Sequence, residues 1–288
     1  MDSLKLDCPA KLNLNLSVLG KRIDGMHEIK TRFQLINLFD EMVIKKTASK
    51  SISVKTNLGP SVDDNKNIVF TAIKLLSDHI GKKIYCEVEI FKHIPMGGGL
   101  GGGSSNAAAA LIGTNCLFKL GLSAQELMLL GEKLGADVPF FIYGKNAFAS
   151  GIGEILIEEK KHIDDRYLLL FPQIHSSTKE LFSKWDDLNK SAQESILINE
   201  ENSFLPIFLD QNQDIKSIFH ELCESNSFKL SGTGSTIFCA YNDVNEIEKT
   251  LKKIPSKWRH SFCEPLQKEC LHLGGIIFKV FSISFLSL

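Results

Sequence analysis

The sequence lacks the cysteine spacing of a zinc site or a disulfide-bonded scaffold. Its seven cysteines include no C-x-x-C pair, and their number is odd. Zinc sites usually use such close pairs, and secreted disulfide scaffolds usually carry an even number of cysteines. Scattered cysteines are more typical of reduced thiols. We therefore expect a cytoplasmic protein without a structural metal.

An excess of charge of one sign and a long apolar run are also lacking. The 288 residues include 33 Lys and Arg against 34 Asp and Glu, a net charge of −1. Nucleic acids and anionic membranes attract proteins through positive charge, so neither is expected as a partner. No basic and then apolar leader opens the chain. The apolar tract at 271–288 contains Lys279 and is short for a membrane span of ~20 residues.

Apolar periodicity predicts both strands and helices along the whole chain. Mixed helices and short strands in both halves predict an α+β fold. The predicted strands are 5–19, 28–44, 85–90, 167–171, two within 228–241, and 258–264. The predicted helices are 67–79, 124–134, 178–188, 202–209, 214–225 and 243–253, and a further helix follows the glycines at 97–103. Ser123 and Glu126 form a capping box at the start of the helix 124–134. Residues 135–139 are expected to be tight and non-helical.

The length predicts about two domains at ~150 residues each. Charged residues crowd together near 158–165, which marks a boundary. We expect an N-terminal domain at 1–158, a C-terminal domain at 159–270 and an apolar tail of unknown role at 271–288.

Six glycines in the seven positions 97–103 are the most informative feature. Glycine lets a ligand approach the backbone closely, and amides at a helix start form an anion site, above all for phosphate. The run is not a P-loop, because Ser104 stands where Lys is required, and its G-x-G-x-x-G match is weak in so glycine-rich a stretch. We expect another type of phosphate cradle, with Ser104 or Ser105 offering a hydroxyl to phosphate or Mg²⁺. A helix cap is an equally good interpretation of Ser104.

Four segments taken together resemble the GHMP small-molecule kinases, from about residue 8 to about residue 268. The match is closer still to the 4-diphosphocytidyl-2-C-methyl-D-erythritol kinase family. The segments are PAKLNLNLSVLGKRIDGMHEI (9–29), IPMGGGLGGGSSNAAAAL (94–111), GADVPFFIYGKNAFASGIGE (135–154) and LSGTGSTIF (230–238). The resemblance implies a two-domain fold with ATP and substrate in the inter-domain cleft. It implies ATP-dependent phosphorylation of the 2-hydroxyl of a cytidine diphosphate-linked methylerythritol, with Mg²⁺, in the non-mevalonate isoprenoid pathway.

The same resemblance implies the residues of the site. Asp137 matches the catalytic base and Lys11 the active-site lysine, which would pair with Asp137 and offset charge on the transferring phosphoryl group. Asn67 and Lys92 match positions near the adenine. The loop residues expected to bind ATP are Pro95, Met96, Gly97, Gly98, Gly99, Leu100, Gly101, Gly102, Gly103, Ser104 and Ser105.

For the second substrate, the resemblance implies Asn13 and His27, the latter at the cytosine. Met26 stands where relatives usually have a stacking Tyr, and a thioether can still lie against a ring. Phe182 aligns with the other stacking aromatic, although a core phenylalanine is an equally good interpretation. Asn106 stands where relatives usually have Asp, which alters either Mg²⁺ handling or only helix capping.

Three other functions remain as alternatives. Another GHMP kinase, for homoserine, mevalonate or a sugar, is disfavoured by residues 24–28 and by the glycine loop. A nucleotide-binding regulatory protein without activity is disfavoured because both Lys11 and Asp137 are present. A dinucleotide-dependent oxidoreductase is weakest, because no acidic residue is placed on a second strand for a ribose.

Overall fold

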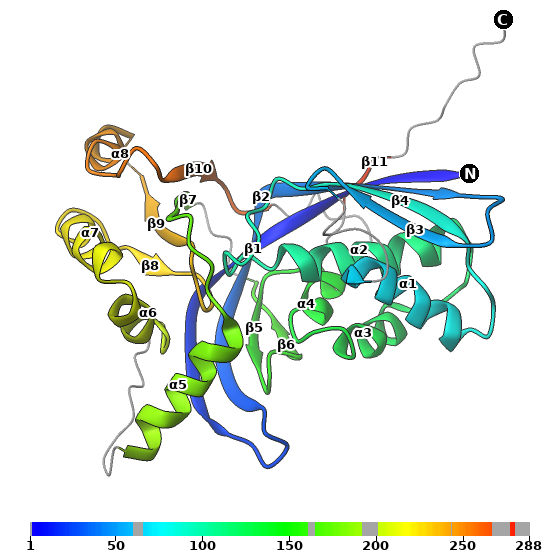
Figure 1. Cartoon of the computed structure of the whole chain (residues 1–288), viewed down its shortest axis with the longest axis horizontal. Helices are drawn as coiled ribbons and strands as arrows, with labels where there is room; N and C mark the ends of the chain where they lie inside the picture. The colour runs from blue at the N-terminus through cyan, green and yellow to red at the C-terminus, as the bar shows by residue number, and fades with distance from the viewer. Residues whose placement is uncertain are drawn as a thin grey trace, which may run out of the picture.

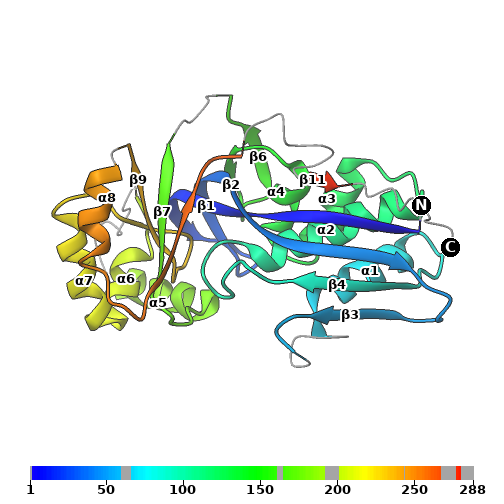
Figure 2. The same ribbon diagram turned by 90° about the horizontal axis from the view of Figure 1, so that it is seen from above.

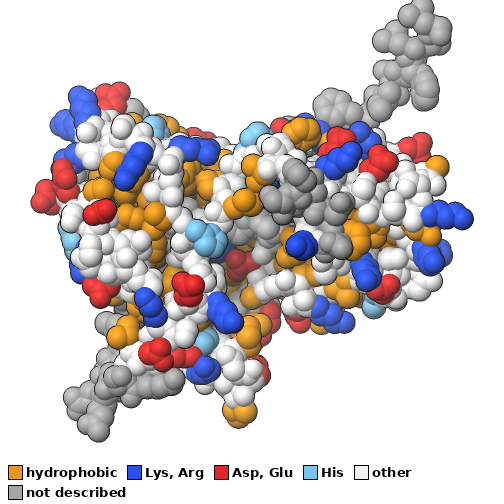
Figure 3. All heavy atoms as spheres, viewed as in Figure 1, with side chains coloured by type: hydrophobic (Ala, Val, Ile, Leu, Met, Phe, Trp, Pro, Cys, Tyr) orange, Lys and Arg blue, Asp and Glu red, His pale blue; other side chains and the backbone are white. Residues whose placement is uncertain are grey.

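Two sheets with their own helices lie next to each other along the long axis of the molecule (Figures 1 and 2). The structure is a computed structural model that describes residues 2–59, 66–160, 165–191, 201–242, 244–266 and 277–279. The predicted α+β class is confirmed. Lys, Arg, Asp and Glu are interspersed over the face seen in Figure 3, without a large patch of one sign.

A long antiparallel hairpin forms the centre of the first sheet. Its strands are β1 (Ser3–Lys21) and β2 (His27–Lys46). The antiparallel β4 (Cys86–Phe91) pairs with β2. The predicted strands at 5–19, 28–44 and 85–90 are thus confirmed. The sequence analysis missed β3 (Ile52–Thr56), which is parallel to β4, and the hairpin of β5 (Ala147–Ser150) and β6 (Ile155–Glu158), which extends from β2.

Four helices cover one face of the first sheet (Figure 2). They are α1 (Ile68–His79), α2 (Gly102–Leu117), α3 (Ala124–Glu132) and α4 (Val138–Tyr143). The capping box of Ser123 and Glu126 at the start of α3 is confirmed. The prediction that 135–139 is non-helical is wrong at its end, because Val138 and Pro139 open α4. Proline is tolerated there, since the first turn of a helix needs no partner for its N–H.

The second sheet has the order β10-β7-β9-β8 and is antiparallel throughout. Its strands are β7 (Arg166–Phe171), β8 (Lys229–Leu230), β9 (Ile237–Tyr241) and β10 (Arg259–Cys263). The helices α5 (Thr178–Ser191), α6 (Leu205–Gln211), α7 (Gln213–Cys223) and α8 (Val244–Leu251) cover one face. Leu168 and Leu170 face these helices, whereas Tyr167 and Leu169 pack against β1 and β2. Successive side chains of a strand point to opposite faces, and in β7 both faces are covered, so both are buried.

The β1–β2 hairpin links the two halves. Its far end supplies Leu16, Val18 and Ile29 to the hydrophobic core of the second half. The backbone N–H of Leu16 donates to the carbonyl of Glu201 at 3.0 Å. We propose the domain boundary between β6 and β7, with this hairpin shared by both cores.

The apolar tail is described only at 277–279, and the remainder of the predicted tail at 271–288 lies outside the described residues. Residues 277–279 form β11 (Ile277–Lys279), which pairs with β1 at the edge of the first sheet. Across the described ranges, no helix combines the length and apolar content needed to cross a membrane.

Burial makes the core cysteines poor nucleophiles. It raises the pKa of the Cys263 thiol to about 11 and that of the Cys239 thiol to about 12. The thiol form therefore dominates at neutral pH, while the thiolate is the reactive form. Within the described residues there is no cluster of three or more His, Cys, Asp or Glu able to hold a metal ion.

Gly113 sets how closely α2 approaches the β1–β2 hairpin. A Cβ there would lie 2.6 Å from Leu6 Cδ1 and 2.9 Å from Ile44 Cδ1, both in the core. We expect Gly113→Val to lower the free energy of unfolding by about 1–3 kcal/mol through overpacking. Denaturant titration checks this result. Gly103→Ala, in the same helix with open space at its Cβ, is the matched control and should be neutral or stabilising. Equal stability of the two variants would contradict the close packing.

Candidate active site

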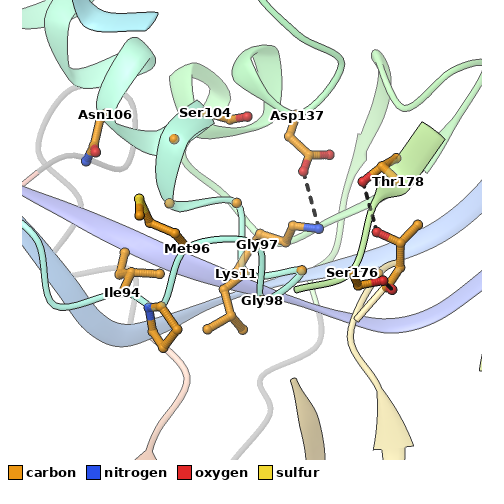
Figure 4. A pocket seen from close by; sticks show the side chains of 18 of the residues that line it. Lys11, Ile94, Met96, Gly97, Gly98, Ser104, Asn106, Asp137, Ser176 and Thr178 are labelled. Atoms are coloured by element: carbon orange, nitrogen blue, oxygen red, sulfur yellow. Dashed lines mark hydrogen bonds and ion pairs between the residues drawn. The ribbon is translucent and has the colours of Figure 1, made fainter. Parts of the chain in front are cut away.

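A cavity of about 670 Å³ opens where the glycine loop of the first half meets the second half (Figure 4). Most of the predicted site residues line it. These are Lys11, Asn13, Asn67, Lys92, Pro95, Met96, Gly97, Gly98, Gly99, Leu100, Gly101, Gly102, Gly103, Ser104, Asp137 and Phe182. Among the described residues that were predicted for the site, Ser105, Met26 and His27 lie outside the lining.

The loop at 97–103 packs against a second glycine-containing loop, residues 231–235, from the other half. The Ser231 hydroxyl donates to the carbonyl of Gly99 at 3.0 Å. The backbone N–H of Thr236 donates to the carbonyl of Gly98 at 3.2 Å. Gly99 has φ +73°, and a Cβ there would lie 2.1 Å from the carbonyl oxygen of Ser231. Only glycine fits this contact, which fixes the glycine loop against the second half.

The start of α2 presents backbone N–H groups to the cavity. Gly101, with φ +70°, is the N-cap residue, and no side chain in the described part of the chain caps the helix. Ser104 lies inside the first turn, so the interpretation of Ser104 as the cap is wrong; its side chain lines the cavity. Ser105 is fully buried behind the loop. An uncapped helix start in a cavity is suited to an anion, because its amides and the helix dipole both favour negative charge.

Lys11 and Asp137 form an ion pair inside the cavity, with Lys11 Nζ 3.3 Å from Asp137 Oδ2 (Figure 4). The Lys11 side chain is 4% exposed and that of Asp137 is 31% exposed. Lys11 also donates to Asn13 Oδ1, and Asn13 Nδ2 donates to Thr31 at 2.8 Å. Asp137 precedes α4 but makes no capping bond to the described residues of that helix. Its carboxylate is therefore oriented by Lys11 and open to the cavity on its other side.

Of the two residues predicted to lie near the adenine, Lys92 belongs to a buried polar network. Lys92 donates to Asp40 Oδ2 and, at 2.7 Å, to Asn106 Oδ1. Asn106 lies within α2, so the expectation that it caps the helix is wrong; its amide nitrogen donates to Asp40 at 3.1 Å. Asn67 is the N-cap of α1, where its side chain accepts from Val69 N at 2.9 Å. The sequence analysis missed Asp40, which carries no motif of its own.

Met26 and His27 lie at the turn end of the β1–β2 hairpin. Met26 is 46% exposed. His27 Nε2 is 2.6 Å from Asp186 Oδ1 on α5, and its ring centroid lies 4.5 Å from that of Phe182. Burial acts to raise the pKa of Asp186, but hydrogen bonds from Lys21 and His27 outweigh it, so the pKa lies below its ordinary value. The imidazole is thus held by Asp186 and supports Phe182, which lines the cavity.

Three hydroxyl side chains of the second half line the same cavity as Lys11 and Asp137. Ser176 donates to the carbonyl of Thr233 at 2.6 Å, and the hydroxyls of Thr178 and Thr233 are 3.0 Å apart. All three line the cavity. No role was predicted for Thr233 within the segment at 230–238, and single hydroxyl residues outside a motif give no signal.

The chain resembles known kinases in both sequence and structure. Residues 67–145 match the model of the GHMP kinases N terminal domain. The 4-diphosphocytidyl-2-C-methyl-D-erythritol kinase of Pasteurella multocida is 36% identical, over 93% of this chain and 92% of its own length. The enzyme of the same name from Haemophilus ducreyi is 39% identical, over 88% of this chain and 92% of its own length.

Solved structures of kinases also superpose on this chain. A crystal structure of 4-(cytidine 5′-diphospho)-2C-methyl-D-erythritol kinase superposes with a TM-score of 0.72 at 25% identity, covering 90% of this chain and 99% of the other. A homoserine kinase from Cytophaga hutchinsonii shares the fold with a TM-score of 0.68 at 16% identity, covering 97% of this chain and 98% of the other. The chain therefore belongs to the 4-diphosphocytidyl-2-C-methyl-D-erythritol kinase family of the GHMP kinases and is a small-molecule kinase.

Proposed function

We propose that the chain transfers the γ-phosphoryl group of ATP to the 2-hydroxyl of 4-diphosphocytidyl-2-C-methyl-D-erythritol. The observation that carries this proposal is the Lys11–Asp137 pair, which lies in one cavity with an uncapped, glycine-rich helix start. Relatives named for this substrate cover nearly the whole chain. The product would serve the methylerythritol phosphate pathway to isoprenoids, in the cytoplasm.

We expect ATP to bind in the cavity in one orientation. The triphosphate would bind the backbone N–H groups at the start of α2, where the helix dipole favours negative charge. The base would then lie farther along the cavity, against Asn67 and apolar side chains, with Lys92 next to the start of α2. These apolar side chains are Ile68, Ile90 and Met96. A flat purine suits such an end, because ligand pockets combine apolar walls with a few polar groups.

Asp137 would act as the base and Lys11 as a charge stabiliser. Phosphoryl transfer depends mainly on in-line positioning and on neutralising the charge of the transferred group. Asp137, held by Lys11, would accept the proton of the substrate hydroxyl. The ammonium of Lys11 would face the phosphoryl oxygens in a cavity where little water competes, so its charge counts for more than in solution. The hydrogen bond from Lys11 to Asn13 would hold the lysine side chain in this position.

Mg²⁺ fits this site as an ion bound largely by the nucleotide. Asp137 is the acidic residue that lines the cavity in the described part of the chain. Magnesium commonly keeps several waters and binds through substrate phosphates with one or two protein oxygens. The Ser104 hydroxyl would be one of those oxygens. When bound, the ion would neutralise phosphate charge.

The cytidine end of the substrate would lie along α5. Phe182 presents a ring to the cavity, and His27 supports that ring from behind. The hydroxyls of Ser176, Thr178 and Thr233 would lie between this end and Lys11, within reach of the diphosphate or the erythritol. Met26, at the hairpin turn, would close over the base only in part, because a thioether offers less area than an aromatic ring.

The fold by itself does not choose this substrate. Homoserine kinase and mevalonate kinase share the fold with this chain at 16% identity. The choice is supported by relatives at 36–39% identity that are named for the cytidyl substrate.

The direct test offers the purified protein ATP, Mg²⁺ and each candidate acceptor. We expect 4-diphosphocytidyl-2-C-methyl-D-erythritol to gain one phosphoryl group, identified by mass, with the position assigned by phosphorus NMR. Homoserine and mevalonate should remain unmodified. Turnover of either of these without turnover of the cytidyl compound would overturn the substrate assignment while leaving the kinase assignment intact.

Asp137→Asn removes the base while keeping the shape of the side chain. General base assistance contributes ~10²–10⁴-fold, so kcat should fall by that order. ATP affinity and thermal stability should stay close to the parent, because Asp137 is not part of a core. Lys11→Ala should also lower kcat, and the two losses should be non-additive if the pair acts as one unit. A kcat for Asp137→Asn within threefold of the parent would remove Asp137 from the mechanism.

Gly99→Ala tests whether the contact between the two loops matters for the nucleotide. Its Cβ would meet the Ser231 carbonyl, and its φ of +73° disfavours any side chain, so the loop must move. We expect kcat/KM for ATP to fall by at least about tenfold, equivalent to ~1.4 kcal/mol. Gly20→Ala, with open space at its Cβ, serves as the control and should match the parent. Unchanged ATP kinetics in a folded Gly99→Ala would exclude this role.

A further inference from the structure

Asp40 is a fully buried carboxylate at the base of the glycine loop. Its Oδ1 accepts the backbone N–H groups of His93 at 2.7 Å and Ile94 at 2.9 Å. Its Oδ2 accepts from Lys92 and from Asn106. A buried carboxylate is costly unless every lone pair is used in this way. One oxygen thus binds the segment between β4 and the glycine loop, and the other binds a lysine of the cavity.

Lys92 is the group through which Asp40 can reach a ligand. Its side chain is 8% exposed and lines the cavity, next to Gly102 at the start of α2. An ammonium has three donors, and Asp40 and Asn106 take two of them. Among the described residues, no third acceptor is bonded to Lys92 Nζ. The fixed lysine therefore has one N–H left for an acceptor in the cavity.

We propose that Asp40 is a positioning residue for the nucleotide and acts through Lys92. The proposal rests on the proposed function, in that the cavity takes ATP. Asp40 holds the ammonium so that its remaining N–H points to an acceptor on the nucleotide bound at the start of α2. A long lysine side chain otherwise loses much rotamer freedom when it binds, so holding it in advance favours binding.

The amide of Asn106 suits this arrangement better than a carboxylate does. Its oxygen accepts from Lys92 while its nitrogen donates to Asp40. Aspartate at this position would set two buried carboxylates around one ammonium, and like charges at this distance repel. Asparagine therefore keeps the buried cluster balanced at one cation and one anion.

Asp40→Asn separates the two roles of the carboxylate. If the new amide oxygen keeps the bonds from His93 and Ile94, the amide nitrogen faces Lys92. Two donors then oppose each other, and the ammonium is displaced. Lys92→Met removes the ammonium and keeps the apolar stem. In that background Asp40→Asn has no lysine to displace.

The experiment measures the Kd of ATP by calorimetry for the parent, the two single variants and the double variant. A hydrogen bond to a charged group contributes strongly to binding, so Lys92→Met, which loses this bond, should raise the Kd of ATP about tenfold. We expect Asp40→Asn to raise Kd at least about fivefold. The double variant should match Lys92→Met, because Asp40 acts only through Lys92. The KM of the cytidyl substrate should not change in any variant.

Two results would overturn the proposal. One is an ATP Kd for Asp40→Asn within twofold of the parent. The other is a double variant that binds ATP more weakly than Lys92→Met, which would mean that Asp40 acts by itself or only on folding. If a single variant does not fold, the double variant is compared with the parent instead, since removing both members of a buried pair is tolerated better than removing one. An ATP Kd of the double variant within twofold of the parent would then overturn the proposal. A parent that does not bind ATP would instead refute the proposed function.

Discussion

The contact between two glycine-containing loops, one from each half of the chain, holds the site together. Backbone meets backbone where Gly99 lies against Ser231, at a distance that admits no Cβ. This contact fixes the loop at 97–103, and the loop in turn sets where α2 begins. The backbone N–H of Lys11 donates to the carbonyl of Leu100 at 3.0 Å, so β1 is tied to the same loop. The uncapped start of α2 and Lys11 are thus held in one frame.

The second constraint is electrostatic. Lys11 and Lys92 are both nearly buried cations, and each is matched by an acidic residue, Asp137 and Asp40 respectively. The two pairs differ in exposure: Asp40 is sealed, whereas Asp137 is 31% exposed to the cavity. A sealed carboxylate can only position its partner. An open one can also exchange a proton with a ligand, which is the distinction that our assignment of roles uses.

Much of the fold could be predicted from the sequence, because long amphipathic elements such as 5–19 and 67–79 reveal their own periodicity. Short elements could not be predicted. The strands β5 and β6 have four residues each, too few to show a period. The helix α4 has six residues and carries Pro139 in its first turn, which the sequence pattern suggested was non-helical. Motifs predicted the loop, Lys11 and Asp137. Asp40 and Thr178 lie in no motif, and they reach the site through contacts between residues distant in sequence, which no local pattern encodes.

The most direct test of the account is a crystal structure with a non-hydrolysable ATP analogue and 4-diphosphocytidyl-2-C-methyl-D-erythritol. The account predicts the triphosphate on the amides at the start of α2, and the 2-hydroxyl within hydrogen-bond distance of Asp137. It also predicts that Lys11 lies beside the terminal phosphoryl group. A complex with the hydroxyl on another residue, and with Asp137 turned away from both ligands, would contradict it.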